Sequence, residues 1–73
     1  MNKQEQDLKQ AVHEIESAVE NGEIEFAIER LQIKSRKLGL KLIDELRRSH
    51  TEFPTQFLTE MWRAEQDLIW ESK

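Results

Sequence analysis

The stretch that decides the fold runs from Ile24 to Leu46 and reads IEFAIERLQIKSRKLGLKLIDEL. On a helix, at about 100° per residue, its apolar residues form two stripes on opposite sides. The broader stripe comprises Ile24, Ala27, Ile28, Leu31, Leu38, Leu42 and Leu46. The second comprises Phe26, Ile33 and Leu40. One stripe is enough to attach a helix to a core, so we expect the second to contact another helix, a second copy of the chain or a different protein.

The composition is that of one small helical domain. The chain has 73 residues, of which 36% are charged and 37% hydrophobic, with two Gly, one Pro and no Cys. A chain of this length forms a single core of limited net stability, and this composition favours helices over strands or disorder. We therefore expect one all-α domain over residues 1–73, with frayed ends at Met1–Gln4 and Glu71–Lys73.

Cysteine content and hydropathy bear on the expected location of the protein. Without Cys the chain cannot form a disulfide or a thiolate metal site, which fits a reducing, intracellular setting. No apolar run reaches the roughly 18 to 20 residues of a membrane span, and the polar start of the chain lacks the apolar centre of a signal peptide. We expect a soluble cytoplasmic protein with no membrane partner.

Helix-breaking residues divide the chain into three parts. Asn21-Gly22 is typical of a helix stop, and Phe53-Pro54 follows a basic segment that suits a helix C-terminus. We therefore predict three amphipathic helices, over about residues 5–20, 23–49 and 54–71. Gly39 falls inside the second of them, where it is a tolerated weakness, a point of close helix approach or a break into two shorter helices.

The two stripes of the middle helix favour an open or layered arrangement, because a closed three-helix bundle turns each apolar face toward one axis. In one interpretation, the other two helices cover both stripes within a single chain. In the other, one stripe stays exposed as a surface for self-association or for a partner. A homodimer would satisfy both interpretations.

The predicted helix over residues 54–71 has the broadest apolar face, and we expect it to be the main contributor to the core. The face comprises Phe57, Leu58, Met61, Trp62, Ala64, Leu68 and Ile69. Glu65 projects from the middle of this face, where it either pairs with an Arg or Lys of the middle helix or faces water or a partner. Trp70 falls on the polar side, as an interface anchor or as a residue that wraps over the domain edge.

Charge is distributed unevenly along the chain. Residues 1–32 carry a net −5, residues 33–50 a net +4 and residues 51–73 a net −3, within a total of −4. The basic residues of the middle helix form a ladder on one flank, comprising Arg30, Lys34, Lys37, Lys41 and Arg48. Such a ladder could bind nucleic-acid phosphates, although Asp44 interrupts it and no aromatic residue interleaves with it for base stacking.

The sequence shows no pattern of a catalytic or cofactor site. It lacks Cys and Tyr, its two His residues lie in separate helical regions, and no Gly-rich loop could cradle a phosphate. His13 with Glu16 or Glu20 supplies two metal ligands from one helix face, whereas a metal site needs at least three. We expect no enzyme activity, no cofactor and no metal.

The stretch Glu20-Asn21-Gly22-Glu23, which joins the first two predicted helices, is similar to the hairpin turn of the small subunit of exonuclease VII. The resemblance covers about a third of the chain and rests on turn chemistry common to helical hairpins. The helix from Pro54 to Lys73 has no counterpart there, so the resemblance implies no activity or site for this chain.

The functional expectation is a small non-enzymatic regulator or inhibitor that docks a helical surface on a larger bacterial or phage protein or enzyme complex. The predicted contact residues are the apolar line Phe26, Ile33 and Leu40, the anchors Trp62 and Trp70, and the basic rim Arg30, Lys34, Lys37 and Lys41. A nucleic-acid-associated protein using the basic ladder is the alternative, and a purely structural homodimer is a third.

Overall fold

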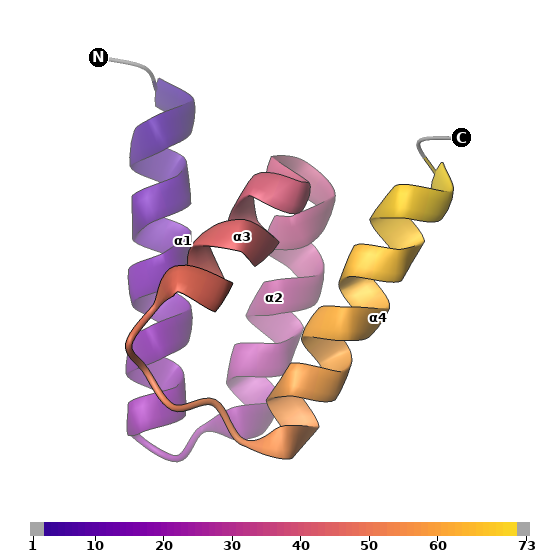
Figure 1. The fold of residues 1–73 in the computed structure, drawn as a ribbon. Helices are drawn as coiled ribbons and strands as arrows, with labels where there is room; N and C mark the ends of the chain where they lie inside the picture. The colour runs from indigo at the N-terminus through magenta and orange to yellow at the C-terminus, as the bar shows by residue number, and fades with distance from the viewer. Residues whose placement is uncertain (1–2, 72–73) are drawn as a thin grey trace.

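A computed structural model describes residues 3–71, and every regular element in this range is an α-helix (Figure 1). The helices are α1 (Lys3–Glu20), α2 (Ile24–Leu38), α3 (Leu40–Arg48) and α4 (Thr55–Glu71). The all-α prediction is confirmed. The single helix predicted over residues 23–49 is wrong, because the chain forms two helices there.

The break between α2 and α3 occurs at Gly39. Its backbone has φ 71° and ψ −153°, a region that is essentially restricted to glycine. The Gly39 amide donates a 2.8 Å hydrogen bond to the carbonyl of Ser35, which closes α2, and the Gly39 carbonyl accepts a 3.1 Å bond from Leu42, which opens α3. Gly39 is therefore a break between two shorter helices, which is one of the three roles predicted for it.

The turn between α1 and α2 is a Schellman motif. Gly22, with φ 80°, donates to the carbonyl of Val19 at 3.0 Å, and Glu23 donates to the carbonyl of Ala18 at 2.8 Å. These bonds satisfy the free carbonyls at the end of α1 and reverse the chain. The stop predicted at Asn21-Gly22 is confirmed.

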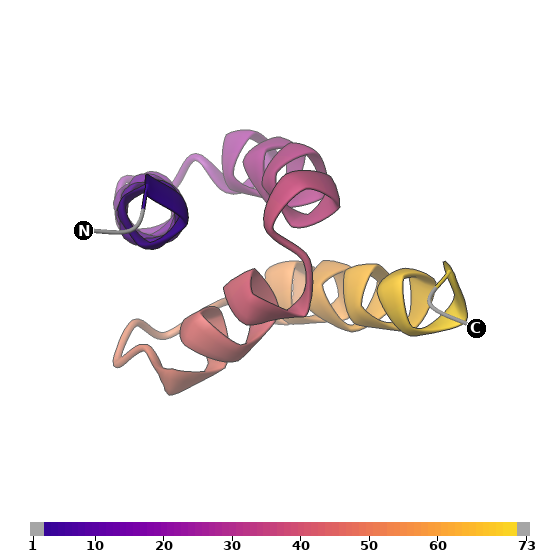
Figure 2. The ribbon, with the colours of Figure 1, turned by 90° about the horizontal axis from the view of Figure 1, so that it is seen from above.

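The helices lie in two layers (Figures 1 and 2). The hairpin of α1 and α2 forms one layer, and α3 with α4 forms the other. The helix α2 contacts all three other helices, and α3 contacts both α1 and α4, whereas α1 and α4 do not contact each other. Each end of the chain therefore packs on the central pair without meeting the other end.

The core lies between the two layers and draws on all four helices. Its buried hydrophobic residues are Ala11, Ile15, Ala18, Val19, Ala27, Leu31, Leu42, Ile43, Leu46, Phe57 and Met61. Phe57 is fully buried and stacks on Phe53 with ring centroids 4.8 Å apart. The broad stripe predicted over residues 24–46 supplies four of the core residues, which confirms that this side faces inward.

The linker between α3 and α4 is fastened to α1 by one carboxylate. A single oxygen of Glu16 accepts hydrogen bonds from the hydroxyls of Ser49 and Thr51, the latter at 3.0 Å. The Thr51 amide in turn donates to the Ser49 hydroxyl at 3.1 Å. These bonds fix where the chain leaves α3 and so where α4 begins.

The helices extend further toward both ends of the chain than the predicted fraying allows. Lys3 and Gln4 belong to α1, and Glu71 belongs to α4, so fraying is wrong for these three residues. The remaining positions of that prediction, 1–2 and 72–73, lie outside the described residues.

Candidate functional site

The predicted apolar line of Phe26, Ile33 and Leu40 is exposed in the single chain. The three side chains are 40%, 47% and 41% exposed, so the interpretation in which other helices cover this stripe is wrong. The break at Gly39 places Leu40 on α3, however, and the chain changes direction there. The continuous line of three is therefore reduced to a pair on α2.

Phe26 and Ile33 lie on one side of α2 together with basic residues, and we call this surface the α2 face (Phe26, Arg30, Ile33, Lys34 and Lys37). The guanidinium of Arg30 lies 5.1 Å from the centre of the Phe26 ring. Its Nε is also 2.8 Å from a carboxylate oxygen of Glu14 on α1. Arg30 is thus held in place, and it keeps the exposed Phe26 ring in a defined position.

The other cations of α2 have no ion pair among residues 3–71. Lys34 is half-buried, Arg36 and Lys37 are exposed, and no carboxylate oxygen of the described residues lies within 4.0 Å of their charged nitrogens. The helix therefore presents two apolar side chains beside an excess of positive charge.

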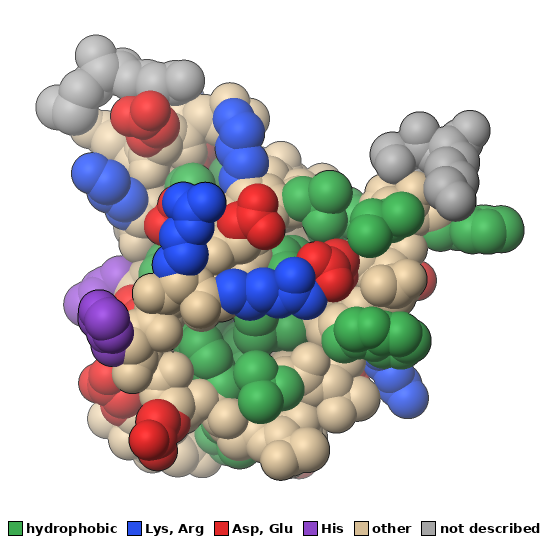
Figure 3. All heavy atoms as spheres, in the orientation of Figure 1, with side chains coloured by type: hydrophobic (Ala, Val, Ile, Leu, Met, Phe, Trp, Pro, Cys, Tyr) green, Lys and Arg blue, Asp and Glu red, His purple; other side chains and the backbone are tan. Residues whose placement is uncertain are grey.

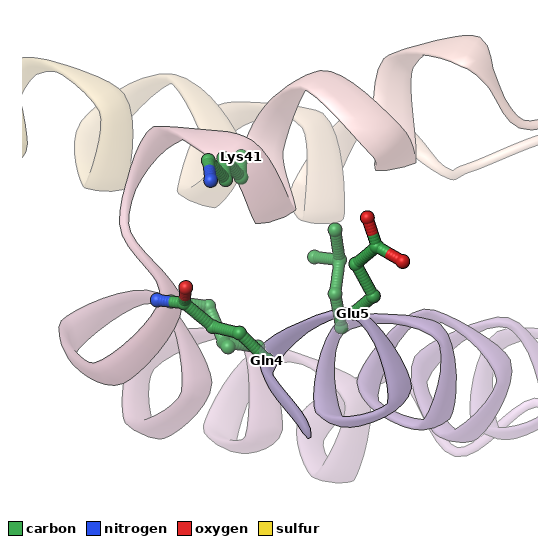
Figure 4. Close-up of a pocket in the computed structure, with 5 residues that line it drawn as sticks. Gln4, Glu5 and Lys41 are labelled. Carbon is green, nitrogen blue, oxygen red and sulfur yellow. The ribbon is translucent and has the colours of Figure 1, made fainter. Parts of the chain in front are cut away.

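The basic ladder predicted over residues 30–48 is divided between two helices. Lys41 lies on α3, where it lines a pocket of about 60 Å³ with Gln4 and Glu5 of α1 (Figure 4). Arg48, also on α3, lies 3.8 Å from Glu45. The rim residues Arg30, Lys34 and Lys37 stay together on α2, and Lys41 is separated from them. Small-molecule sites typically measure about 300–1,000 Å³, so the Lys41 pocket is too small to be one.

The largest exposed apolar surface lies on α4, and we call it the α4 face (Leu58, Trp62, Ile69 and Trp70). These side chains are 48%, 57%, 37% and 77% exposed. The prediction that Leu58, Trp62 and Ile69 belong to the core is wrong. The side of α4 that packs on the core carries Phe57 and Met61, which are buried, and Ala64 and Leu68, which are half-buried. The predicted apolar face is wider than the contacts of α4 with α2 and α3 can cover, and this width is the feature of the sequence that indicates partial exposure.

Glu65 lies within the α4 face and is paired within the same chain. The guanidinium of Arg47 on α3 donates hydrogen bonds of 2.7 and 2.6 Å to the two carboxylate oxygens of Glu65. The hydrogen bond to Glu65 raises the pKa of Arg47 above its ordinary value, outweighing the opposing effect of desolvation. Pairing with a basic residue of the middle segment, one of the two predicted alternatives, is confirmed.

The two candidate faces are separate surfaces. The α2 face borders α1, as the Arg30–Glu14 pair shows, whereas α4 does not contact α1. Hydrophobic side chains gather over α4 on the side shown in Figure 3, while basic and acidic side chains are denser over α1 and α3. The structure therefore does not bring the predicted anchors Trp62 and Trp70 together with the predicted line of Phe26 and Ile33.

Residues 3–71 contain no group of three or more His, Asp or Glu side chains that could hold a metal ion. His13 lies on the exposed side of α1, beside shallow grooves rather than in an enclosed cavity. The described surface offers apolar contact area on two helical faces, and one of them, the α2 face, also carries cations.

No protein-family model matches the sequence, and comparison with curated proteins and with solved structures finds no significant match. None of the helices within residues 3–71 is long and apolar enough to span a bilayer.

Proposed function

We propose that this chain is a non-enzymatic regulator or inhibitor that docks its α2 face on an acidic surface of a larger protein. The observation that carries the proposal is the exposure of Phe26 and Ile33 on one side of α2, beside Lys34 and Lys37, which have no ion pair in the described residues. This combination of apolar anchors and a charged rim is typical of protein interfaces.

Each part of the α2 face has a different role in this proposal. Phe26, already held by Arg30, would enter an apolar pocket of the partner with little loss of side-chain freedom. Ile33 lies two turns further along the helix and extends the contact. Lys34 and Lys37 would accelerate association with a negatively charged surface and align the two proteins.

Nucleic acid is the competing ligand for the same cations, and the geometry favours it less. A phosphate backbone is bound by several cations in register, and the break at Gly39 separates Lys41 from the cations of α2. Phe26 and Ile33 have no role in neutralising phosphates. A protein partner uses both the apolar and the charged parts of the face.

The test is affinity capture from an extract of the cells that produce the protein, with and without nuclease. Three tagged chains are compared: the wild type, the double variant Phe26→Glu/Ile33→Glu, and the control Lys9→Gln/Gln56→Glu. The control makes the same charge change at exposed polar positions on α1 and α4. Circular dichroism and thermal unfolding establish that all three chains are folded.

The proposal predicts a stoichiometric protein partner that survives nuclease, is retained by the control and is lost by the α2 double variant. Because Phe26 and Ile33 are exposed, the double variant should remain helical. Loss of the partner with nuclease would assign the α2 cations to nucleic acid instead. Equal capture by all three chains, or no protein captured by the wild type, would refute docking through the α2 face.

A further inference from the structure

The α4 face is almost free of charge, although more than a third of the chain's residues are charged. Of the other charged residues of α4, Glu60, Asp67 and Glu71 fall on the opposite side of the helix, and Arg63 lies on the flank beside Trp70. The single charged residue within the face is Glu65, whose carboxylate is neutralised by Arg47 of the same chain. On the flank, Arg63 lies 3.9 Å from Glu60. Depletion of charge is the compositional mark of the centre of an interface.

The apolar area of the α4 face is large for a chain of this size. A fully buried aromatic side chain covers about 150–250 Å², so Trp62 and Trp70 with Leu58 and Ile69 expose on the order of 400–500 Å² of apolar surface. The described chain has an accessible surface of 5469 Å². A standard protein interface covers about 800 Å² per partner, about a tenth of a small protein's surface. The apolar part of the α4 face alone is therefore about half of a standard contact area.

We infer that the α4 face is the contact between two copies of this chain, which pack as an antiparallel pair of α4 helices. A surface whose carboxylate is already neutralised within its own chain offers a foreign protein no free ionic group to recognise. The same surface meets a second copy without opposing like charges. A two-fold dimer requires this kind of self-complementary surface.

The order of side chains along α4 favours the antiparallel pairing. The face is narrow at Leu58 and broad at Ile69 and Trp70, so antiparallel packing places the narrow end of each helix against the broad end of its partner. Trp62 then lies near the two-fold axis. Antiparallel packing also opposes the two helix dipoles favourably.

This inference uses a different surface from the proposed docking function and does not depend on it. Because α4 meets the side of α2 that carries Gln32, Ser35 and Arg36 and not the α2 face, dimerisation through α4 leaves both α2 faces uncovered. A dimer of this kind would present two α2 faces to a partner and could bind it with avidity.

Sedimentation equilibrium of the wild-type chain over about 1 µM to 1 mM tests the inference. The wild type should be predominantly dimeric at the upper concentrations, and Trp62→Glu should weaken the dimer by at least about a hundredfold. Trp62→Phe should weaken it by about tenfold or less, and Gln56→Glu, which adds a charge on the polar side of α4, should leave it unchanged. Should Trp62→Glu fail to fold by circular dichroism, Leu58→Glu takes its place.

Disulfide trapping tests the antiparallel orientation, because the chain contains no native Cys. An equimolar mixture of Leu58→Cys and Ile69→Cys chains should form mainly the mixed disulfide. A wild type that stays monomeric throughout, or a Trp62→Glu dimer as stable as the wild type, overturns the inference. Predominant disulfides between identical chains overturn the antiparallel pairing.

Discussion

Arg47, in the last turn of α3, donates two hydrogen bonds of 2.7 and 2.6 Å to the carboxylate of Glu65 in the middle of α4. The Glu65 side chain is only 17% exposed and lies among apolar neighbours, so Arg47 supplies the counter-charge and the hydrogen bonds that a carboxylate needs there. The pair joins two helices that are separated in sequence by a linker. It also removes the one charge that would otherwise mark the α4 face.

Removing Arg47 alone should lower the stability of the fold more than removing both members of the pair. Arg47→Ala should lower the midpoint of thermal unfolding, because it leaves the carboxylate of Glu65 partly buried without its partner. Replacing Glu65 as well, in Arg47→Ala/Glu65→Leu, should restore most of the loss. The measurement is a set of thermal unfolding curves for wild type, single and double variants. Additive losses would show that Glu65 does not depend on Arg47.

The contribution of the Arg47 guanidinium to stability should also be insensitive to pH around neutrality. Glu65 raises the pKa of Arg47, so the guanidinium's contribution is present below its unfolded pKa and is lost only as pH rises through the folded value, far above neutrality. A stability profile between about pH 6 and pH 8 should therefore have the same shape for the wild type and for Arg47→Ala/Glu65→Leu, in which no unpaired carboxylate remains.

Gly39→Ala should destabilise the fold by about 1–3 kcal/mol, because the backbone at this position is in a region that L-amino acids avoid. The added methyl group meets no atom within 4 Å, so the cost comes from the backbone and not from a clash. Urea unfolding measures the free energy, with Gln32→Ala in the exposed part of α2 as a control. If Gly39→Ala were stabilising, a continuous helix over residues 24–48 would be the better description.

The fate of Gly39 illustrates what the sequence could and could not predict. The 3.6-residue period of apolar residues is the same in a straight helix and in two helices joined by a bend. The pattern therefore predicted the helical class correctly, together with the inward orientation of Leu31 and Leu46. A glycine costs only about 1 kcal/mol inside a helix. Whether it bends the chain depends on the packing of Leu42 and Ile43 against the other helices, which no local pattern contains.

Phe57→Ala should cost about 3–5 kcal/mol, because the ring is fully buried and stacks on Phe53. The adjacent Leu58, at 48% exposure, supplies a matched control on the same helix turn. Leu58→Ala should cost less than about 1 kcal/mol at concentrations where the chain is monomeric. Equal losses in urea unfolding would contradict the orientation of α4 described above.

Glu16→Ala should loosen the linker between α3 and α4, because Ser49 and Thr51 both donate to this carboxylate. We expect a loss of about 1–3 kcal/mol and faster hydrogen exchange in residues 49–54. Glu16→Gln retains an acceptor and should have a smaller effect. Glu20→Ala, on the exposed end of α1, is the control. Unchanged exchange in Glu16→Ala would show that the linker is held by other contacts.

The candidate faces were predictable to different degrees. Phe26 and Ile33 are isolated apolar residues on a polar side of their helix, and such residues can be identified from periodicity alone. Leu58 and Trp62 belong to an apolar arc continuous with the core residues Phe57 and Met61. Their exposure is decided by how α4 lies on α2 and α3, which is a tertiary property.

The two surfaces are tested most directly by site-specific photo-crosslinking in extract, with a photoreactive amino acid placed at Ile33 on α2 or at Trp62 on α4. The probe at position 62 should crosslink a second copy of the chain. The probe at position 33 should crosslink a different protein whose recovery survives nuclease. A probe at position 33 that captures only nucleic acid, or no macromolecule at all, would contradict the proposed function.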